Sequence, residues 1–239
     1  KTVITRLFPH EQAKIPLEVG YWAIRGLGAP CRMMVMFAGA PLKATCYECK
    51  PIKEGGFCKK SWFDAKPTFR EKNPLVNLPY VYDAENDILV TQSNAVLQFL
   101  GRRFSMLGKT EKETAACEQL LAEVMDIRND MVKHAYGGDL EAWKKCIATR
   151  KSDSGFNSFK KLEDWLAAKE CKDFFVGSSA TAPDFHIWEM CDQHAHLQTF
   201  VGAEDLFATM PCLGAFHKSF AKLPQNAKYF ESKLSKLPF

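Results

Sequence analysis

The chain has 239 residues, of which 46% are hydrophobic and 25% are charged, and its formal net charge is +4. This length suits one large domain or two smaller ones, with enough residues to bury a core. Acidic and basic residues are interspersed, so the clustered basic surface of a nucleic-acid-binding protein is not expected, and no apolar run approaches the roughly 18 residues of a membrane span.

The chain contains nine cysteines. They are odd in number and scattered, unlike the compact disulfide frameworks of small secreted domains. We therefore expect a reducing compartment. The cytosol is the first expectation, and an organelle interior is the alternative if a targeting segment was removed. Residues 1–15 match no element of the domain that follows, and we interpret them as an N-terminal extension.

The first predicted elements form a strand–helix–strand unit. A short apolar run over residues 16–21 reads as a strand. Pro30 suits the first position of a helix that continues to about residue 38, and Gly39 suits its C-cap. Residues 42–47 alternate well enough for a second strand.

A long loop is predicted next, because residues 50–76 are rich in Lys, Gly, Pro and aromatic residues, with one helical turn expected around Trp62. Two short strands follow, at residues 78–82 and 88–91, joined by an acidic turn. A helix then opens at Gln92. The resulting order, βαβ, connection and ββα, is that of a thioredoxin-like α+β domain.

The chain is therefore predicted to divide into two domains after the extension. A thioredoxin-like domain covers residues 16–104, and an all-helical domain covers residues 110–239. Thr110 and Glu113 form a capping box for the first helix of the second domain. Its predicted helices cover roughly 110–136, 156–169, a stretch starting at Thr181, and 211–223, followed by a basic tail over 224–239.

Pro79 marks a candidate binding edge. X–Pro bonds are the ones in which a cis peptide is inexpensive, and a cis bond here would turn the main-chain N–H and C=O of Leu78 toward solvent. Nearby, the strand-to-helix turn at Gln92 and Ser93 points unpaired N–H groups outward at the positive end of the helix dipole. These features suit a short peptide with a carboxylate, and suggest a peptide–thiol site, most economically for glutathione.

Four motifs occur in order along the chain: Gly20–Leu27 (GYWAIRGL), Ser61–Trp62 (SW), Asn77–Tyr80 (NLPY) and Thr91–Ala95 (TQSNA). In order and spacing they resemble the mu class of the cytosolic glutathione transferases. The resemblance extends from about residue 17 to the last helix. It implies the fold of that family and an enzyme that joins the thiolate of glutathione to electrophilic, apolar co-substrates.

The resemblance implies a catalytic role for Tyr21. A phenol that donates to the sulfur of glutathione favours the thiolate, because hydrogen bonding to the charged form lowers a pKa. The alternative is a tyrosine that ends a strand with its hydroxyl in water. Members of the family conjugate without a metal, and glutathione is the co-substrate.

The family pattern also implies a set of peptide-binding residues. Gln92 and Ser93 would hold the γ-glutamyl carboxylate, although Ser93 would serve equally as an ordinary N-cap. Lys59 stands where an arginine is usual and lacks its planar, two-pronged contact. Ala23 replaces a common Asp. The complete set is Tyr21, Trp22, Leu27, Lys59, Trp62, Lys66, Asn77, Leu78, Pro79, Gln92, Ser93 and Asp126.

Asp126 implies a homodimer. In the family this aspartate reaches the γ-glutamyl amine bound to the neighbouring subunit, whereas a mid-helix Asp is otherwise a solvated or ion-paired residue. The co-substrate pocket would be formed by Leu27, Tyr136 and Tyr229. Tyr136 could donate to a developing charge, or could be a buried ring with a wet hydroxyl.

The remaining cysteine pattern is weaker evidence for a function. Cys46 and Cys49 form a C-x-x-C at the end of the second strand, whereas the redox position of this fold lies between the first strand and the first helix. A dithiol enzyme, or a zinc site with Cys58, is therefore not expected.

The main alternative function is a structural or scaffolding subunit of a larger assembly, since fold does not imply function. A carrier of hydrophobic ligands is also compatible with the apolar cleft.

Overall fold

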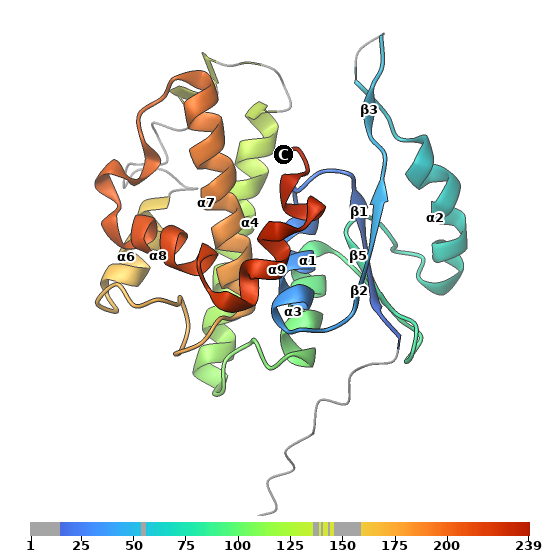
Figure 1. Cartoon of the computed structure of the whole chain (residues 1–239), viewed down its shortest axis with the longest axis horizontal. Helices are drawn as coiled ribbons and strands as arrows, with labels where there is room; N and C mark the ends of the chain where they lie inside the picture. Colours follow the sequence, from blue (N-terminus) through green and yellow to red (C-terminus); the bar gives the residue numbers. More distant parts are fainter. Residues whose placement is uncertain (1–14, 54–55, 136–138, 140, 143, 146–158) are drawn as a thin grey trace, which may run out of the picture.

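The computed structural model describes residues 15–53, 56–135, 139, 141–142, 144–145 and 159–239. One half is built on a four-stranded sheet and the other half is helical (Figure 1). This confirms the predicted thioredoxin-like α+β half followed by an all-α half. The N-terminal extension and Tyr136 lie outside the described residues.

The sheet has the strand order β2–β1–β5–β6. Strands β2 and β1 are parallel, whereas the pairs β1–β5 and β5–β6 are antiparallel. Helices α1 (Gly28–Phe37) and α3 (Ser93–Arg103) lie between the sheet and the helical half, whereas α2 (Lys60–Lys72) lies on the opposite face (Figure 1). The strands are β1 (Leu17–Trp22), β2 (Leu42–Tyr47), β5 (Tyr80–Asp83) and β6 (Ile88–Thr91).

The prediction of a long loop after β2 is wrong. This region forms a small hairpin, β3 (Lys50–Pro51) and β4 (Phe57–Cys58), and the helix α2 (Lys60–Lys72). Pro67 lies inside α2 and removes one helical hydrogen bond, which made a full helix unexpected. The helix nevertheless forms, because Trp62 and Phe69, seven residues apart, share a face that packs against Tyr80.

The helical half is organised around α7, whose residues are mostly buried. Helix α7 begins with a capping box, in which the Thr181 N–H donates to Asp184 at 2.7 Å. At the box predicted for α4, the Glu113 N–H donates to the Thr110 hydroxyl at 3.2 Å, but the Glu113 carboxylate accepts from the Lys109 N–H, one residue earlier than a capping box requires. The helices are α4 (Glu111–Ala135), α6 (Phe159–Ala167), α7 (Ala182–Val201), α8 (Pro211–Ala221) and α9 (Ala227–Glu231).

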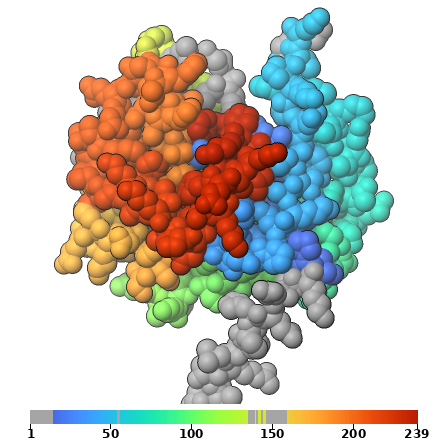
Figure 2. All heavy atoms as spheres, viewed as in Figure 1, coloured from blue at the N-terminus to red at the C-terminus, as the bar shows by residue number. Residues whose placement is uncertain are grey.

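The expected basic tail is instead a packed segment. It contains α9, and Tyr229 is fully buried in the main core cluster. Figure 2 shows this segment lying over the seam between the helical half and the first strand–helix unit. Tyr229 therefore cannot form a wall of an open co-substrate pocket, which corrects that prediction.

Two further features complete the fold. A disulfide joins Cys171 to Cys212, with their Cα atoms 5.0 Å apart, and no sequence pattern predicted it. In the described part of the chain, no helix is both long enough and apolar enough to span a membrane.

Candidate functional site

A cis peptide bond joins Leu78 to Pro79, as predicted. The segment before it is held by Thr91 at the end of β6. The Thr91 hydroxyl accepts a hydrogen bond from the Asn77 N–H at 3.0 Å and donates one to the Asn77 carbonyl at 2.8 Å. Both main-chain groups of Asn77 are therefore satisfied by one buried side chain, which sets the position of Leu78 relative to the sheet. Sequence reasoning missed this role of Thr91.

The turn from β6 into α3 is built around Gln92. Its φ of 72° is in the left-handed region, which is uncommon for a residue other than glycine and costs free energy. The first helical hydrogen bond, from Val96 N–H to the Gln92 carbonyl, is 2.8 Å long. Among the described residues no side chain caps this helix end, so the first N–H groups of α3 are available to an anion.

These two features border one cavity of about 330 Å³. That volume is near the lower end of the range for small-molecule sites. Five residues predicted from the sequence meet here, together with four that were not predicted. The cavity is lined by Leu27, Asn77, Leu78, Gln92 and Ser93 from the predicted set, and by Asn94, Met125, Arg128 and Asn129.

Helix α4 supplies the far wall of the cavity. Met125, Arg128 and Asn129 are spaced i, i+3 and i+4, so they share one face of the helix. This spacing is a signal that could have identified them. Arg128 adds a positive charge to a wall that faces the open end of α3, and the cavity therefore suits a ligand with a carboxylate.

Tyr21 lies beside this cavity but does not line it. The side chain is 4% exposed, and two glycines make room for it. A Cβ at Gly28 would lie 2.6 Å from the Tyr21 Cβ, and a Cβ at Gly26 would lie 2.9 Å from the hydroxyl oxygen. The phenol tip therefore rests against Gly26, next in sequence to Leu27, which does line the cavity.

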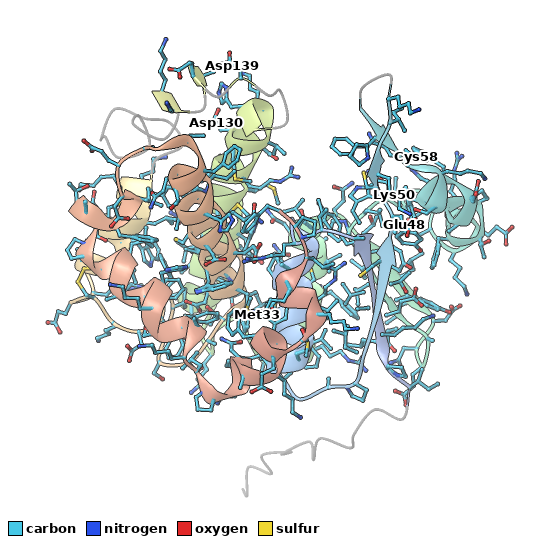
Figure 3. All side chains as sticks on the ribbon, turned by 45° about the horizontal axis from the view of Figure 1, so that its top comes forward. Met33, Glu48, Lys50, Cys58, Asp130 and Asp139 are labelled. Carbon is cyan, nitrogen blue, oxygen red and sulfur yellow. A yellow bond between two sulfur atoms is a disulfide. The ribbon has the colours of Figure 1, made fainter. Side chains whose placement is uncertain are left out.

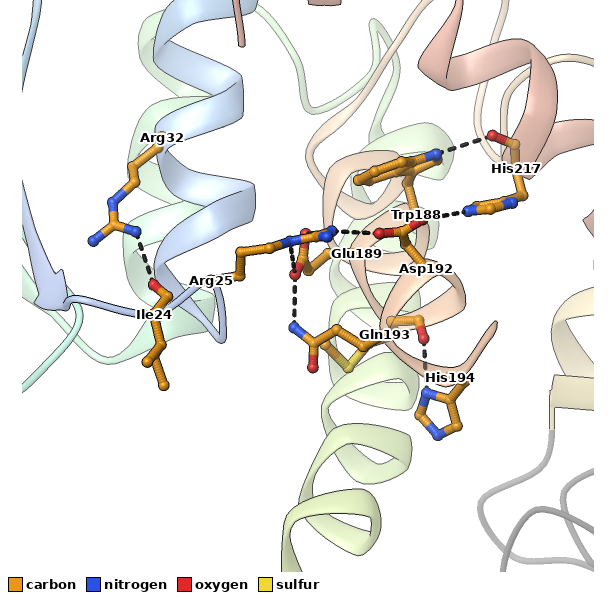
Figure 4. Close-up of polar contacts among 10 residues, drawn as sticks. Ile24, Arg25, Arg32, Trp188, Glu189, Asp192, Gln193, His194 and His217 are labelled. Atoms are coloured by element: carbon orange, nitrogen blue, oxygen red, sulfur yellow. Dashed lines mark hydrogen bonds and ion pairs between the residues drawn. The ribbon is translucent and has the colours of Figure 1, made fainter. Parts of the chain in front are cut away.

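The loop that carries Gly26 is anchored by Arg25. Its guanidinium donates to both carboxylate oxygens of Glu189 on α7, at 3.0 and 2.8 Å, and pairs with Asp192 at 2.7 Å (Figure 4). Its main-chain N–H donates to the Pro238 carbonyl at 2.6 Å. Burial disfavours the cation, yet the two carboxylates hold the pKa of Arg25 above its ordinary value. This buried network was not predicted.

Four members of the predicted peptide-binding set lie outside the cavity: Trp22, Lys59, Trp62 and Lys66. Trp62 is 1% exposed and stacks on Tyr80, in a second core cluster to which Trp22 also packs. Lys66 places its Nζ 5.8 Å from the centre of the Trp62 ring. Lys59 is exposed at the N-cap of α2. Their contact with a ligand stays a prediction.

Two other predicted residues have distinct positions. Pro79 is buried directly behind Leu78, whereas Asp126 is exposed on α4 and does not line this chain's cavity. The role of Asp126 toward a second subunit stays a prediction. Among the residues that the structure describes, no group of three or more His, Cys, Asp or Glu side chains could hold a metal ion.

Comparisons with known proteins agree with this architecture. A family profile described as "Glutathione S-transferase, C-terminal domain" matches residues 125–233. The chain is 31% identical over 222 residues to "Glutathione S-transferase Mu 1" of Oryctolagus cuniculus, covering 91% of this chain and 92% of the relative. It is 28% identical over 225 residues to "Glutathione S-transferase Mu 3" of Homo sapiens, covering 93% and 91%.

A solved structure has the same fold. The crystal structure of the glutathione S-transferase from Ascaris lumbricoides superposes with a TM-score of 0.71 at 22% sequence identity. The match covers 94% of this chain and 98% of that one. At this identity the likeness supports the fold alone.

Proposed function

Because the chain belongs to the glutathione S-transferase family and resembles its mu class, we propose that it conjugates the thiolate of glutathione to electrophilic, apolar co-substrates. The observation that carries this proposal is the cavity in which Leu78 and the open end of α3 meet. Main-chain groups at these two places suit the two ends of a γ-glutamyl-cysteinyl unit, and Arg128 adds a positive charge nearby.

In this proposal the peptide binds mainly to the main chain. The cysteinyl residue pairs with the N–H and C=O of Leu78, whose position the Thr91 hydroxyl holds. The γ-glutamyl carboxylate accepts from the first N–H groups of α3, with the Ser93 hydroxyl as an additional donor. A carboxylate at a helix N-terminus is stabilised by both hydrogen bonds and the helix dipole.

Tyr21 has the catalytic role. Its hydroxyl donates to the sulfur of glutathione, which favours the thiolate over the thiol. The proton of the thiol leaves to solvent, and the sulfur attacks the electrophilic carbon of the co-substrate. With a chloronitroarene the new C–S bond replaces the C–Cl bond, and chloride departs with the bonding electron pair. Each unit by which the thiol pKa falls corresponds to about 1.4 kcal/mol, so a small change multiplies the reactive fraction at neutral pH.

The co-substrate would bind over the apolar part of the same cavity. Its described apolar lining residues are Leu27, Leu78 and Met125. Tyr136 lies outside the described residues, and its part in this pocket stays a prediction from the family pattern. A loosely defined apolar wall favours a range of electrophiles over a single one.

The proposal is tested by steady-state conjugation of glutathione to an activated chloronitroarene. Tyr21→Phe should lower turnover roughly tenfold or more while glutathione affinity changes little. Tyr82→Phe is the matched control, because the Tyr82 hydroxyl donates to exposed Asp87, away from the cavity. Unchanged turnover in Tyr21→Phe would refute the role of Tyr21. No turnover in the unmodified protein would favour the scaffolding alternative.

A further inference from the structure

Arg32 on α1 is a buried cation that forms no ion pair with a carboxylate in the described part of the chain. Its side chain is 0% exposed. One terminal nitrogen donates to the Ile24 carbonyl at 3.0 Å (Figure 4), and the other donates to the Trp22 carbonyl at 3.1 Å. The Nε atom has no hydrogen-bond partner among the described residues. Buried charges are normally paired, so this arrangement points to a missing anion.

The acidic group that Arg32 does contact is a thiol. Its terminal nitrogen that bonds Trp22 also lies 3.5 Å from the Sγ of Cys46, within hydrogen-bond range for sulfur. Cys46 is exposed on β2, an edge strand of the sheet. Main-chain carbonyls are neutral and cannot balance the charge of Arg32. A sulfur anion at Cys46 would balance it and would remain accessible to reagents from solvent.

We propose that Cys46 is a reactive thiol and a modification site for small disulfides. The Cys46 sulfur, as the thiolate, attacks one sulfur of the disulfide. A new S–S bond forms, the original S–S bond breaks, and the departing thiolate takes up the proton that Cys46 released. Cys46 is thereby oxidised and one half of the reagent is reduced, so no further oxidant is needed. This proposal does not depend on glutathione binding in the cavity.

The modified residue would lie close to the proposed catalytic residue. Cys46 is the direct partner of Tyr21 in the parallel ladder between β1 and β2. A group attached to Cys46 would therefore sit one strand away from Tyr21, on the strand whose register sets the position of β1. A modified Cys46 could therefore change the position of Tyr21 without filling the proposed glutathione cavity.

Cys58 provides a matched comparison within the same molecule. It is also exposed and lies on the β3–β4 hairpin, paired in register with Lys50 (Figure 3). Lys50 is exposed and already forms an ion pair with Glu48 at 2.8 Å, so this neighbour is not a buried, uncompensated cation like Arg32. Three further free cysteines are buried: Cys31, Cys117 and Cys191. Their modification by the reagent would show that the fold had opened.

The test uses bis(2-hydroxyethyl) disulfide, an uncharged reagent that has no peptide or carboxylate for the cavity. Full-length protein is reacted for increasing times, and each cysteine is followed by peptide mass spectrometry. Cys46 should form the mixed disulfide roughly tenfold faster than Cys58, with the buried cysteines unmodified. Equal rates at Cys46 and Cys58 would overturn the proposal.

A variant without the charge of Arg32 shows whether the reaction rate at Cys46 depends on that charge or only on the solvent exposure of the thiol. In Arg32→Gln the rate at Cys46 should fall to that of Cys58, whose own rate should not change. If Arg32→Gln opens the fold, modification of Cys31 will reveal it, and Arg32→Met, which also removes the charge and keeps an unbranched side chain, is measured in its place with the same expectation. An unchanged Cys46 rate in a closed variant would also overturn the proposal.

Discussion

The guanidinium of Arg25 is held in a two-pronged hydrogen bond by the carboxylate of Glu189, 164 residues further along the chain. The pair is buried, with side-chain exposures of 8% and 0%. It joins the loop that contacts Tyr21 to the central helix α7. Gln193 supports it by donating to Glu189 at 2.6 Å (Figure 4).

Removing one member of this pair should destabilise the protein more than removing both. Arg25→Met leaves the Glu189 carboxylate buried without its cation, and should lower the free energy of unfolding by about 3–5 kcal/mol. The double variant Arg25→Met/Glu189→Met should recover most of this loss, because an apolar pair can replace a buried ion pair. Urea denaturation measures the free energy of unfolding of the single and the double variant.

Lys60→Met is the matched control for the ion pair. Lys60 pairs with Asp64 on the exposed face of α2, where ion pairs contribute little. Its free energy of unfolding should stay close to that of the unmodified protein. A loss in Arg25→Met no larger than that in Lys60→Met would contradict the structural role of the buried pair.

Thr91→Val should weaken glutathione binding without removing any proposed ligand contact. The variant keeps the side-chain shape but leaves the N–H and C=O of Asn77 unpaired, so the segment that positions Leu78 loosens. We expect a roughly tenfold rise in Kd, from the loss of about one to two hydrogen bonds. Thr45→Val, which removes a hydroxyl bonded to Glu18 in the same sheet, should leave the Kd unchanged. Equal affinities in both variants would refute the role of Thr91.

His186 should make the fold sensitive to acid. Burial, with a smaller effect of Arg128, lowers its pKa from 6.5 to about 3, and neither ring nitrogen has a partner among the described residues. Because the folded-state pKa is below the unfolded one, the unfolded chain binds more protons as pH falls below 6.5. His186 therefore lowers the free energy of unfolding by about 2 kcal/mol between pH 7 and pH 5.

The measurement compares urea denaturation of the unmodified protein and His186→Leu at these two pH values. Between pH 7 and pH 5, the free energy of unfolding of His186→Leu should fall by about 2 kcal/mol less than that of the unmodified protein. Asp184 acts in the opposite direction, since burial raises its pKa to about 6 and its contribution falls as pH rises, but it is present in both proteins and cancels. His196→Leu, at an exposed position, is the control. Identical pH dependence in His186→Leu and the unmodified protein would contradict this assignment.

Asp126 should complete the site of a partner subunit. It is exposed on α4 and is not among the residues that line its own chain's cavity, so it is accessible to a second chain. Asp126→Ala and Tyr21→Phe should each be weakly active alone, and mixing them should restore activity in dimers that combine one intact cavity with one intact Asp126. Glu118→Ala, at another exposed position of α4, replaces Asp126→Ala in the control mixture and should already be active. A monomer in size-exclusion chromatography with light scattering, or no restoration on mixing, would exclude this arrangement.

The parts of the fold with local chemical signals could be predicted from the sequence. The X–Pro bond before β5, the Thr–x–x–Asp box that starts α7 and the turn into α3 each depend on a few adjacent residues. The same motifs identified five of the nine residues that line the cavity. Local signals also explain why α1 and β2 were predicted within two residues of their observed ends.

The parts that were missed depend on distant partners. The partners of Arg25 lie 164 residues or more away, so no window of sequence reveals the pair. Helix α2 is stabilised by packing of Trp62 and Phe69 on the sheet, which outweighs the unfavourable Pro67. The C-terminal segment reads as a basic tail because its charges are frequent, yet Tyr229 anchors it in the core.

The central claim is that the cavity at Leu78 and Ser93 binds glutathione through main-chain groups. Isothermal titration of the purified protein with glutathione and with the dipeptide Cys–Gly tests it most directly, because the dipeptide lacks the γ-glutamyl carboxylate. We expect one glutathione per chain and far weaker binding of Cys–Gly. No binding of glutathione, or equal binding of both peptides, would contradict the account.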